Sequence, residues 1–566
     1  MKKILMNRHK QHLVRSLLVL ITVLLTANVS LAQQNGCGVV QDLLFTNGKI
    51  HTMDTQNRIV GSVHIIGNRI AAVGTGKAGT SECTQTINLH GKTVVPGLID
   101  IHNHIILLGL RPGHDTRLEN DRSITDVLNT LSARAKTLPR GAWITAIGGF
   151  DINQFTPPPA KPRFPTLAEL DSVTPDNPVY IQESFSGPGV TNSLGKRFFE
   201  SKGIKIGANG ELAGGFKTPN PSTRALYELN KLRTFADEKR GTLEALHYAV
   251  SLGITTQLDE GAFPATGTAS DGAASADPST YYKPVLALHA EGKLPNRLRV
   301  NFLYMETDPR TPLLQARLSN AFQFFGDDML RVVGIGEFTA GASPIIMQRT
   351  KVWMDGTRRV AKAGWHNENH SLTKTDFATI IDGWEQVNAE LPKPGITKLR
   401  WVVAHVPFIT QEYAKKLMQL GGGVNVLGGW RYISGNKQNN GPPFRMLLNS
   451  GIHMGMSSDG MQISPMNPWL GLYYVVTGRN ARGELINAGQ TLNRDEAIHL
   501  YTAANGWFLR EEDKLGTIEP GKYADLVVLS ADYFDGKAVP DEVIKDLHSI
   551  LTVVGGKVVY GDPDSL

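Results

Sequence analysis

The chain has 566 residues, 41% of them hydrophobic, and a formal net charge of +6 from 58 Lys and Arg against 52 Asp and Glu. Five of the basic residues and no acid lie in the first fifteen positions, which leaves 53 basic residues against 52 acidic ones in the rest. Net charge therefore gives no reason to expect a nucleic-acid partner. The two cysteines, Cys37 and Cys83, exclude a zinc site of four thiolates.

Residues 1–32 have the features of a secretory signal peptide. A basic start is followed by an apolar run from Ser16 to about Thr26 and by small residues up to Ala32. The run is shorter than the ~20 residues that a membrane-spanning helix needs, so we expect cleavage after Ala32 rather than retention as an anchor. The mature protein is then predicted to be periplasmic or secreted, without stable membrane insertion. There, Cys37 and Cys83 either form a disulfide or remain two independent buried thiols.

Residues 37–93 and 513–566 predict one small β module built from both ends of the chain. The segment 42–53 breaks at Asn47-Gly48, a strong hairpin signal. The segments 524–529 and 550–560 supply similar strands at the far end. Short strands need a partner sheet, so we predict that the two ends meet in a β-sandwich.

The intervening residues 94–512 predict an α/β domain of the (β/α)8, or TIM barrel, type. Short apolar segments alternate there with longer amphipathic ones. Strands are expected at 97–101, 143–147, 179–181, 255–258, 299–303, 332–335, 401–404, 423–427 and 453–456. Because nine strands exceed eight, one of them is expected to be extra or split.

The segment Pro96–His104 ends an apolar strand in His102-Asn103-His104. Side chains two apart on a strand point the same way, so both histidines can hold one ion. Barrel active sites lie where strands end. Two surface histidines on a strand are nevertheless common, and the pair needs further support.

Four other segments offer that support. Glu337, His405 and Asp459 each follow an apolar strand, and His370 follows an amphipathic helix. Imidazole and carboxylate groups suit zinc, with Mn, Fe or Ni as alternatives. The sequence therefore predicts a divalent metal site at the mouth of the barrel.

These residues resemble the amidohydrolase superfamily, and within it the amidohydrolase family 3 branch, which includes N-substituted formamide deformylases. Pro96–His104 looks like the first-strand metal motif of that superfamily. The resemblance extends over residues 39–565 and is carried by similar segments at 209–214, 251–259, 457–460, 467–472 and 515–529.

The resemblance implies a metal-dependent hydrolase that cleaves the C–N bond of an amide, formamide or cyclic amide. It also implies one or two divalent ions, zinc above all, with Asp459 as both ligand and general base. The chemistry is consistent, since a metal lowers the pKa of water from 15.7 toward ~7 and a carboxylate can take its proton. The metal ligands that the resemblance implies are His102, His104, His370, His405 and Asp459.

Three positions depart from the family pattern. Glu337 stands where relatives commonly carry a lysine, and it either bridges two metals or forms a structural ion pair beside one. Gly187 stands where a histidine is expected, so the contact that this histidine usually makes with the substrate or oxyanion has no assigned residue. The Gly-Asp expected after His370 is absent, and His366 is an alternative ligand.

Further contacts and other functions remain open. Trp430 and Arg431 follow a predicted strand and are candidate substrate-binding residues, although a solvated Arg431 is the alternative. Asp259 is either a site residue or a strand-end acid. An esterase, a lactonase or a non-hydrolytic enzyme would use the same scaffold, as would a catalytically silent barrel that binds a small molecule. We expect a small-molecule substrate, and a homodimer is one option.

Overall fold

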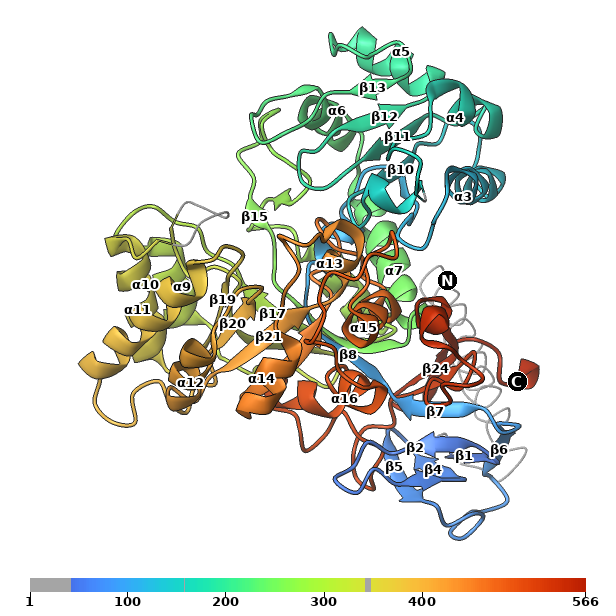
Figure 1. The fold of residues 1–566 in the computed structure, drawn as a ribbon, viewed down its shortest axis with the longest axis vertical. Helices are drawn as coiled ribbons and strands as arrows, with labels where there is room; N and C mark the ends of the chain where they lie inside the picture. The colour runs from blue at the N-terminus through green and yellow to red at the C-terminus, as the bar shows by residue number, and fades with distance from the viewer. Residues whose placement is uncertain (1–41, 157, 342–347) are drawn as a thin grey trace, which may run out of the picture.

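The computed structural model describes residues 42–156, 158–341 and 348–566, which form three parts (Figure 1). The leader, its cleavage site and Cys37 lie outside the described residues, so the predicted export and the Cys37–Cys83 bond stay predictions. In the described ranges, every helix is too short or too polar to cross a bilayer.

Eight parallel strands form a barrel and confirm the predicted fold class. The barrel closes where β22 meets β8: the N–H of Asp459 donates to the carbonyl of His102 (2.8 Å), and the N–H of His104 donates to that of Gly460 (2.7 Å). The metal-binding candidates therefore lie at the seam of the barrel. In spatial order, the strands are β8 (Leu98–Asn103), β14 (Ile254–Asp259), β17 (Arg297–Phe302), β18 (Leu330–Ile335), β19 (His366–His370), β20 (Val402–His405), β21 (Gly423–Leu427) and β22 (His453–Ser457).

Helices pack around the barrel strands and bury their apolar faces against them. In α10, for example, Trp353 and Val360 are buried, Thr350 caps the N-terminus and Gly364 ends the helix with a positive φ. The helices in and around the barrel are α2 (Ile105–Gly109), α7 (Phe235–Ser251), α8 (Lys283–Ala290), α9 (Pro312–Asn320), α10 (Lys351–Ala363), α11 (Asp376–Glu390), α12 (Gln411–Gln419), α13 (Gly429–Ser434), α14 (Phe444–Ser450), α15 (Pro468–Thr477), α16 (Arg494–His499) and α17 (Gly506–Leu509).

Two strands expected in the barrel, 143–147 and 179–181, belong instead to a separate sheet inserted between β8 and β14. The expectation was wrong because alternating strands and helices give the same pattern in either place. The insertion forms a lobe beyond α13 and α7 (Figure 1). Its elements are β9 (His114–Asp115), α3 (Ile124–Lys136), β10 (Ile144–Ile147), α4 (Leu167–Val173), β11 (Val179–Gln182), β12 (Gly189–Thr191), α5 (Ser193–Ser201), β13 (Glu211–Leu212) and α6 (Pro221–Asn230).

Both ends of the described chain meet in two further sheets. In one of them, β7 pairs with β23, which lies more than 400 residues later in sequence. Phe45 and Ile65 of one sheet and Leu526 and Val553 of the other belong to one buried cluster, as in a sandwich. The sheets contain β5 (Arg69–Val73), β4 (Val63–Ile66), β1 (Asp42–Thr46) and β6 (Gln85–Asn88), and β25 (Lys557–Tyr560), β24 (Ser549–Val554), β23 (Leu526–Leu529), β7 (Thr93–Pro96), β2 (Lys49–His51) and β3 (Ile59–Val60).

Candidate metal centre

Four histidines and two acids gather at the carboxyl ends of five barrel strands. They come from β8, β19 and β20 and from the first or second residue after β8, β18 and β22. None is more than 6% exposed, so all six lie at the bottom of the barrel mouth. The six are His102, His104, Glu337, His370, His405 and Asp459.

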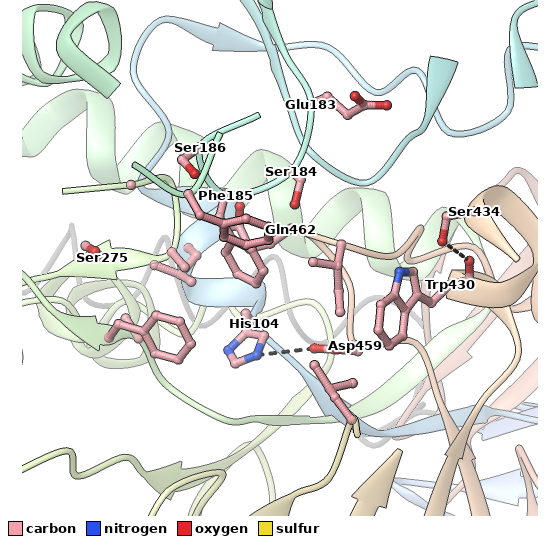
Figure 2. Close-up of a pocket in the computed structure, with 18 of the residues that line it drawn as sticks. His104, Glu183, Ser184, Phe185, Ser186, Ser275, Trp430, Ser434, Asp459 and Gln462 are labelled. Atoms are coloured by element: carbon pink, nitrogen blue, oxygen red, sulfur yellow. Dashed lines mark hydrogen bonds and ion pairs between the residues drawn. The ribbon is translucent and has the colours of Figure 1, made fainter. Parts of the chain in front are cut away.

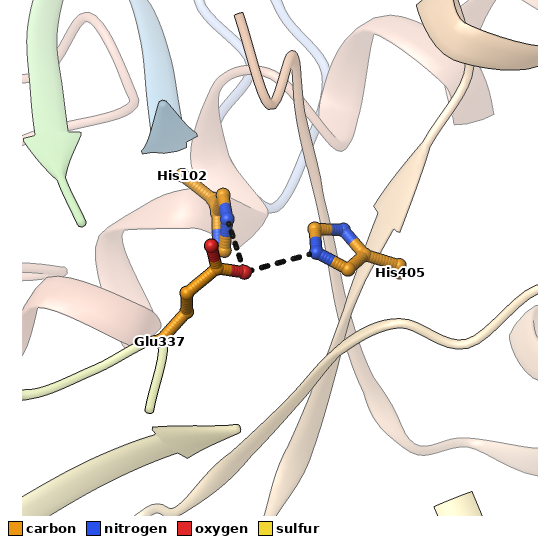
Figure 3. Close-up of side chains that lie close together, drawn as sticks. All are labelled: His102, Glu337 and His405. Carbon is orange, nitrogen blue, oxygen red and sulfur yellow. Dashed lines mark hydrogen bonds and ion pairs between the residues drawn. The ribbon is translucent and has the colours of Figure 1, made fainter. Parts of the chain in front are cut away.

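Glu337 lies at the centre of this group. Its Oε2 is 2.8 Å from Nδ1 of His370, 3.4 Å from Nε2 of His405 and 3.5 Å from Nε2 of His102. Its Oε1 is 3.3 Å from Nε2 of His104. Figure 3 shows the carboxylate between His102 and His405. One carboxylate thus faces the histidines in and after β8 and those of β19 and β20.

Asp459 completes the group from the opposite side of the barrel seam. Its Oδ1 is 3.3 Å from Nε2 of His104 and 3.6 Å from Nε2 of His102, and its Oδ2 is 3.8 Å from Nε2 of His405. The backbones of His405 and Asp459 have φ values of 70° and 50°. Such left-handed conformations cost about 1–3 kcal/mol for non-glycine residues and persist mainly at functional sites.

The ring hydrogen bonds of His102 and His104 leave one nitrogen of each ring available to a metal. Nδ1 of His102 lies 2.7 Å from Oε1 of Glu368, and Nδ1 of His104 lies 2.8 Å from the carbonyl of Gly261. A histidine that donates through one nitrogen presents the lone pair of the other. Nε2 of His102 is buried without a hydrogen-bond partner in the described residues. These nitrogens and the nearby carboxylates form a donor set that fits zinc.

The balance of charge also fits a cation. Glu260, Glu337, Glu368 and Asp459 are buried together, and among the described residues their ion pairs are with histidine and none with Lys or Arg. Burial strongly raises the pKa of Glu260, and the neighbouring Glu368 raises it further. A dication would offset this excess of carboxylates.

Burial would raise the pKa of Glu337, but His370, His102 and His104 hold it well below its usual value, so Glu337 is ionised at neutral pH. Burial would likewise lower the pKa of His102, but Glu368 and Glu337 hold it well above its usual value. The acids and imidazoles of the site therefore shift one another's pKa strongly.

Sequence reasoning missed Glu368 and Glu260 as parts of this site. Glu368 lies two residues before His370 on β19, and residues two apart on a strand share a face. That spacing was the available signal, but β19 had not been predicted as a strand. Glu260 follows β14 directly and accepts hydrogen bonds from Asn301.

The structure also shows where His366, the alternative metal ligand, and Asp259, the possible site residue, lie. His366 begins β19, at the end away from the cluster, where burial and Arg510 lower its pKa to about 4. Asp259 accepts hydrogen bonds from the backbone N–H groups of Ile106 and Gly261 and from the Tyr282 hydroxyl. It therefore links the segments that follow β8 and β14.

A cavity of about 510 Å³ opens above the cluster and is lined by His104, Glu337, His370 and Asp459 at its base (Figure 2). Trp430 also lines it. Arg431 does not: it is 1% exposed and packs 4.0 Å from the centre of the Trp430 ring, so it is neither solvated nor in the cavity wall.

Gly187, the position of the missing histidine, lies in the loop after β11. A Cβ atom there would be 2.2 Å from the carbonyl oxygen of Glu183. This loop conformation has no room for a side chain at residue 187. A histidine contact from that position is therefore incompatible with the observed backbone.

Comparisons with known proteins agree with this geometry. A model described as the amidohydrolase family matches residues 85–560. N-substituted formamide deformylase from Arthrobacter pascens is 23% identical over 92% of this chain and 98% of its own length.

Among solved structures, a metal-dependent hydrolase from Pyrococcus horikoshii has a TM-score of 0.57 and 18% identity, over 88% of this chain and 98% of its own. Atrazine chlorohydrolase from Arthrobacter aurescens, complexed with zinc, has a TM-score of 0.54 and 16% identity, over 92% and 96%. These structures share the fold. Because the family model spans most of its length, the chain belongs to the amidohydrolase family.

Proposed function

We propose that this protein is a metal-dependent hydrolase that cleaves the C–N bond of a small-molecule amide, with Asp459 as the general base. The observation that carries the proposal is the position of Glu337, within 3.5 Å of a nitrogen of all four histidines. Asp459 lies beside three of these histidines, His102, His104 and His405, and lines the cavity. The relative that acts on N-substituted formamides, a C–N hydrolase by name, supports the same chemistry.

The residues would hold the metal in two overlapping sets. His102, His104 and Asp459 form one set, and His102, Glu337 and His405 form the other. His104 and His370 also contact the shared Glu337 carboxylate. A divalent cation makes water more acidic and polarises a carbonyl group, which is the chemistry that amide hydrolysis requires. We propose zinc, two ions per chain, because the shared carboxylate faces both sets.

Asp459 is suited to move the proton. Burial would raise its pKa, but His405 and His104 lower it, so the carboxylate is ionised and can accept a proton from the attacking water. The water oxygen bonds to the carbonyl carbon and the C–N bond breaks. The carboxylic acid of Asp459 then gives its proton to the departing nitrogen, and the products are a carboxylic acid and an amine.

Two measurements test the proposal. The first is metal analysis of the purified protein, for which we expect a zinc content near two per chain. A value near one would leave Glu337 as a structural ion-pair partner, and a metal-free protein that gains no activity with added zinc would reject the proposal.

The second measurement is turnover of a panel of amides, esters and lactones by the Asp459→Asn variant. We expect kcat to fall by about 10²–10⁴, the usual contribution of a general base. The exposed Asp513→Asn is the matched control and should keep wild-type rates. Unchanged turnover by Asp459→Asn would remove this residue from the mechanism, and turnover of esters alone would replace the amide assignment.

A further inference from the structure

Aromatic side chains form part of the largely apolar wall of the cavity. Phe150, Phe185, Phe216, Phe263 and Trp430 line it above the metal-binding residues. Figure 2 shows Phe185 and Trp430 on either side of the space above His104 and Asp459. A wall of this kind favours an apolar or aromatic ligand body.

Two carboxyl groups interrupt this wall and have no cationic partner. Asp151 and Glu183 both line the cavity, whereas none of its lining residues is Lys or Arg. Glu183 accepts a hydrogen bond from the N–H of Ile152, and Asp151 accepts one from that of Asn153. Neither forms an ion pair within the described residues. Figure 2 shows Glu183 across the cavity from His104 and Asp459.

The protein environment disfavours the ionised form of this pair. Burial, with a further contribution from the charge of Asp151, raises the pKa of Glu183 to about 7. Burial also raises the pKa of Asp151. A ligand cation beside them would offset both effects, because it favours ionised carboxylates.

Gln462 provides an independent indication of a ligand. It lines the same cavity and is only 2% exposed, and neither its side-chain oxygen nor its side-chain nitrogen has a hydrogen-bond partner in the described part of the chain. A buried carboxamide left without partners is destabilising, because its desolvation is not offset by hydrogen bonds. Figure 2 shows Gln462 between Glu183 and Asp459. Its donor and acceptor match those of a secondary amide.

We propose that the substrate is an amide with an apolar, preferably aromatic, body and a protonated amine at the end remote from the metal site. Gln462 hydrogen-bonds the amide group, the aromatic side chains enclose the body, and Asp151 and Glu183 bind the ammonium group. This proposal rests on the proposed amidase function and specifies its substrate class.

Two matched probes test it: an N-(2-arylethyl)formamide with a para-aminomethyl group, and its isostere with a para-ethyl group. For the zinc-loaded wild-type protein at pH 8, we expect kcat/KM for the cationic probe to exceed that for the neutral one by about 10-fold or more, since hydrogen bonds to charged groups contribute about 1.5–3 kcal/mol. Equal values, or a preference for the neutral probe, would overturn the proposal.

The acid pair is tested by a double variant, Asp151→Asn with Glu183→Gln, which keeps the size of both side chains. It should remove the preference for the cationic probe, so that the ratio of the two kcat/KM values falls to about one. Glu200→Gln, an exposed change on α5 in the same lobe, is the control and should keep the preference. A preference that survives in the double variant would refute the role of the two acids.

Gln462→Leu tests the third contact. Because both probes carry the same formamide, kcat/KM should fall for both by a similar factor, about 5- to 10-fold for one hydrogen-bonding group. An unchanged value for both would remove Gln462 from the proposal.

Failure of the proposed function would look different from failure of this inference. If neither formamide were hydrolysed, calorimetric titration of the same zinc-loaded protein would compare binding of the two probes. Tighter binding of the cationic probe, lost in the double variant, would support the inference even so. Equal binding, or no binding of either probe, would overturn it.

Discussion

Glu337 is the residue on which the candidate site depends, because its carboxylate lies within 3.5 Å of a nitrogen of all four histidines, whereas Asp459 contacts three of them. The family resemblance leads us to expect a lysine at this position, and Glu337 supplies a carboxylate there without any modification of the side chain. Glu368 orients one of these histidines. It contacts Nδ1 of His102, and Nε2 of that ring then faces the site.

We predict that Glu368→Gln weakens metal binding by about 10- to 100-fold, the usual effect of losing a carboxylate behind a metal-bound histidine. Glu368 also accepts a hydrogen bond from Asn425, so the glutamine variant keeps one of its contacts. Competition with a chelator measures the affinity. Glu385→Gln on α11, remote from the site, is the control, and wild-type affinity in Glu368→Gln would contradict a positioning role.

At the scale of elements, β19 has the most unusual composition of the barrel strands. Its sequence is His-Asn-Glu-Asn-His, and all five side chains are buried. Several of its polar groups have partners: Thr339 donates to Asn367, Trp353 donates to Asn369, and Glu337 contacts His370. Nε2 of His366, Nδ2 of Asn367 and Nε2 of His370 are buried without a hydrogen-bond partner in the described residues. A polar strand is stable in a barrel only when such bonds offset its desolvation.

The inserted lobe also contains a buried acid, Asp121, whose titration affects stability. Asp121, just before α3, is 8% exposed, accepts a hydrogen bond from Thr130 and has no partner for Oδ2 in the described residues. Burial raises its pKa from 3.8 to about 7. The folded state therefore holds a proton that the unfolded state releases near pH 4, and the stability contributed by this group falls as pH rises from about 4 to about 7.

We predict that Asp121→Asn stabilises the protein by up to about 4 kcal/mol above pH 7 and changes little near pH 4, since three pKa units correspond to about 4 kcal/mol. Urea unfolding of both proteins at pH 4, 6 and 8 measures the difference. A gain that did not increase with pH would show that Asp121 is not the titrating group.

At the scale of the whole molecule, the barrel and the sandwich are joined by a buried ion pair. Arg297 on β17 donates to both carboxylate oxygens of Asp525, at 2.8 and 3.0 Å, and its guanidinium lies 3.8 Å from the centre of the Tyr523 ring. Asp525 directly precedes β23 and also accepts the N–H of Gly555. The ion pair thus connects two segments that are more than 200 residues apart in sequence.

We predict that Arg297→Met destabilises the protein by about 3–5 kcal/mol, because it leaves Asp525 buried and unpaired. The double variant with Asp525→Asn should recover most of that loss, since it removes the unpaired charge. Chemical unfolding measures both, with the exposed Arg310→Met as a control that should not shift the transition. A double variant as unstable as Arg297→Met would contradict the electrostatic explanation.

The leader adds a prediction for the whole protein. We expect export to remove residues 1–32 and leave Gln33 as the first residue, because a basic start, a short apolar run and small residues precede it. Mass spectrometry of the protein from a periplasmic fraction measures this. A full-length chain in the membrane fraction would show that the leader is retained as an anchor.

Local sequence pattern by itself determined the barrel class, the sandwich strands at both ends and the strand-end positions of His102, His104, Glu337, His405 and Asp459. These follow from apolar segments whose burial is encoded within a few residues, and parallel strands bring their carboxyl ends together. His370 was identified too, but its strand was not.

Tertiary structure alone decided the rest. It placed the strands at 143–147 and 179–181 in an inserted lobe, made the polar β19 a barrel strand and brought Glu368 to His102. It also placed Asp151, Glu183 and Gln462 around one cavity. The physical reason is that burial of a polar side chain depends on partners distant in sequence, whereas hydrophobic periodicity reports only on its own segment.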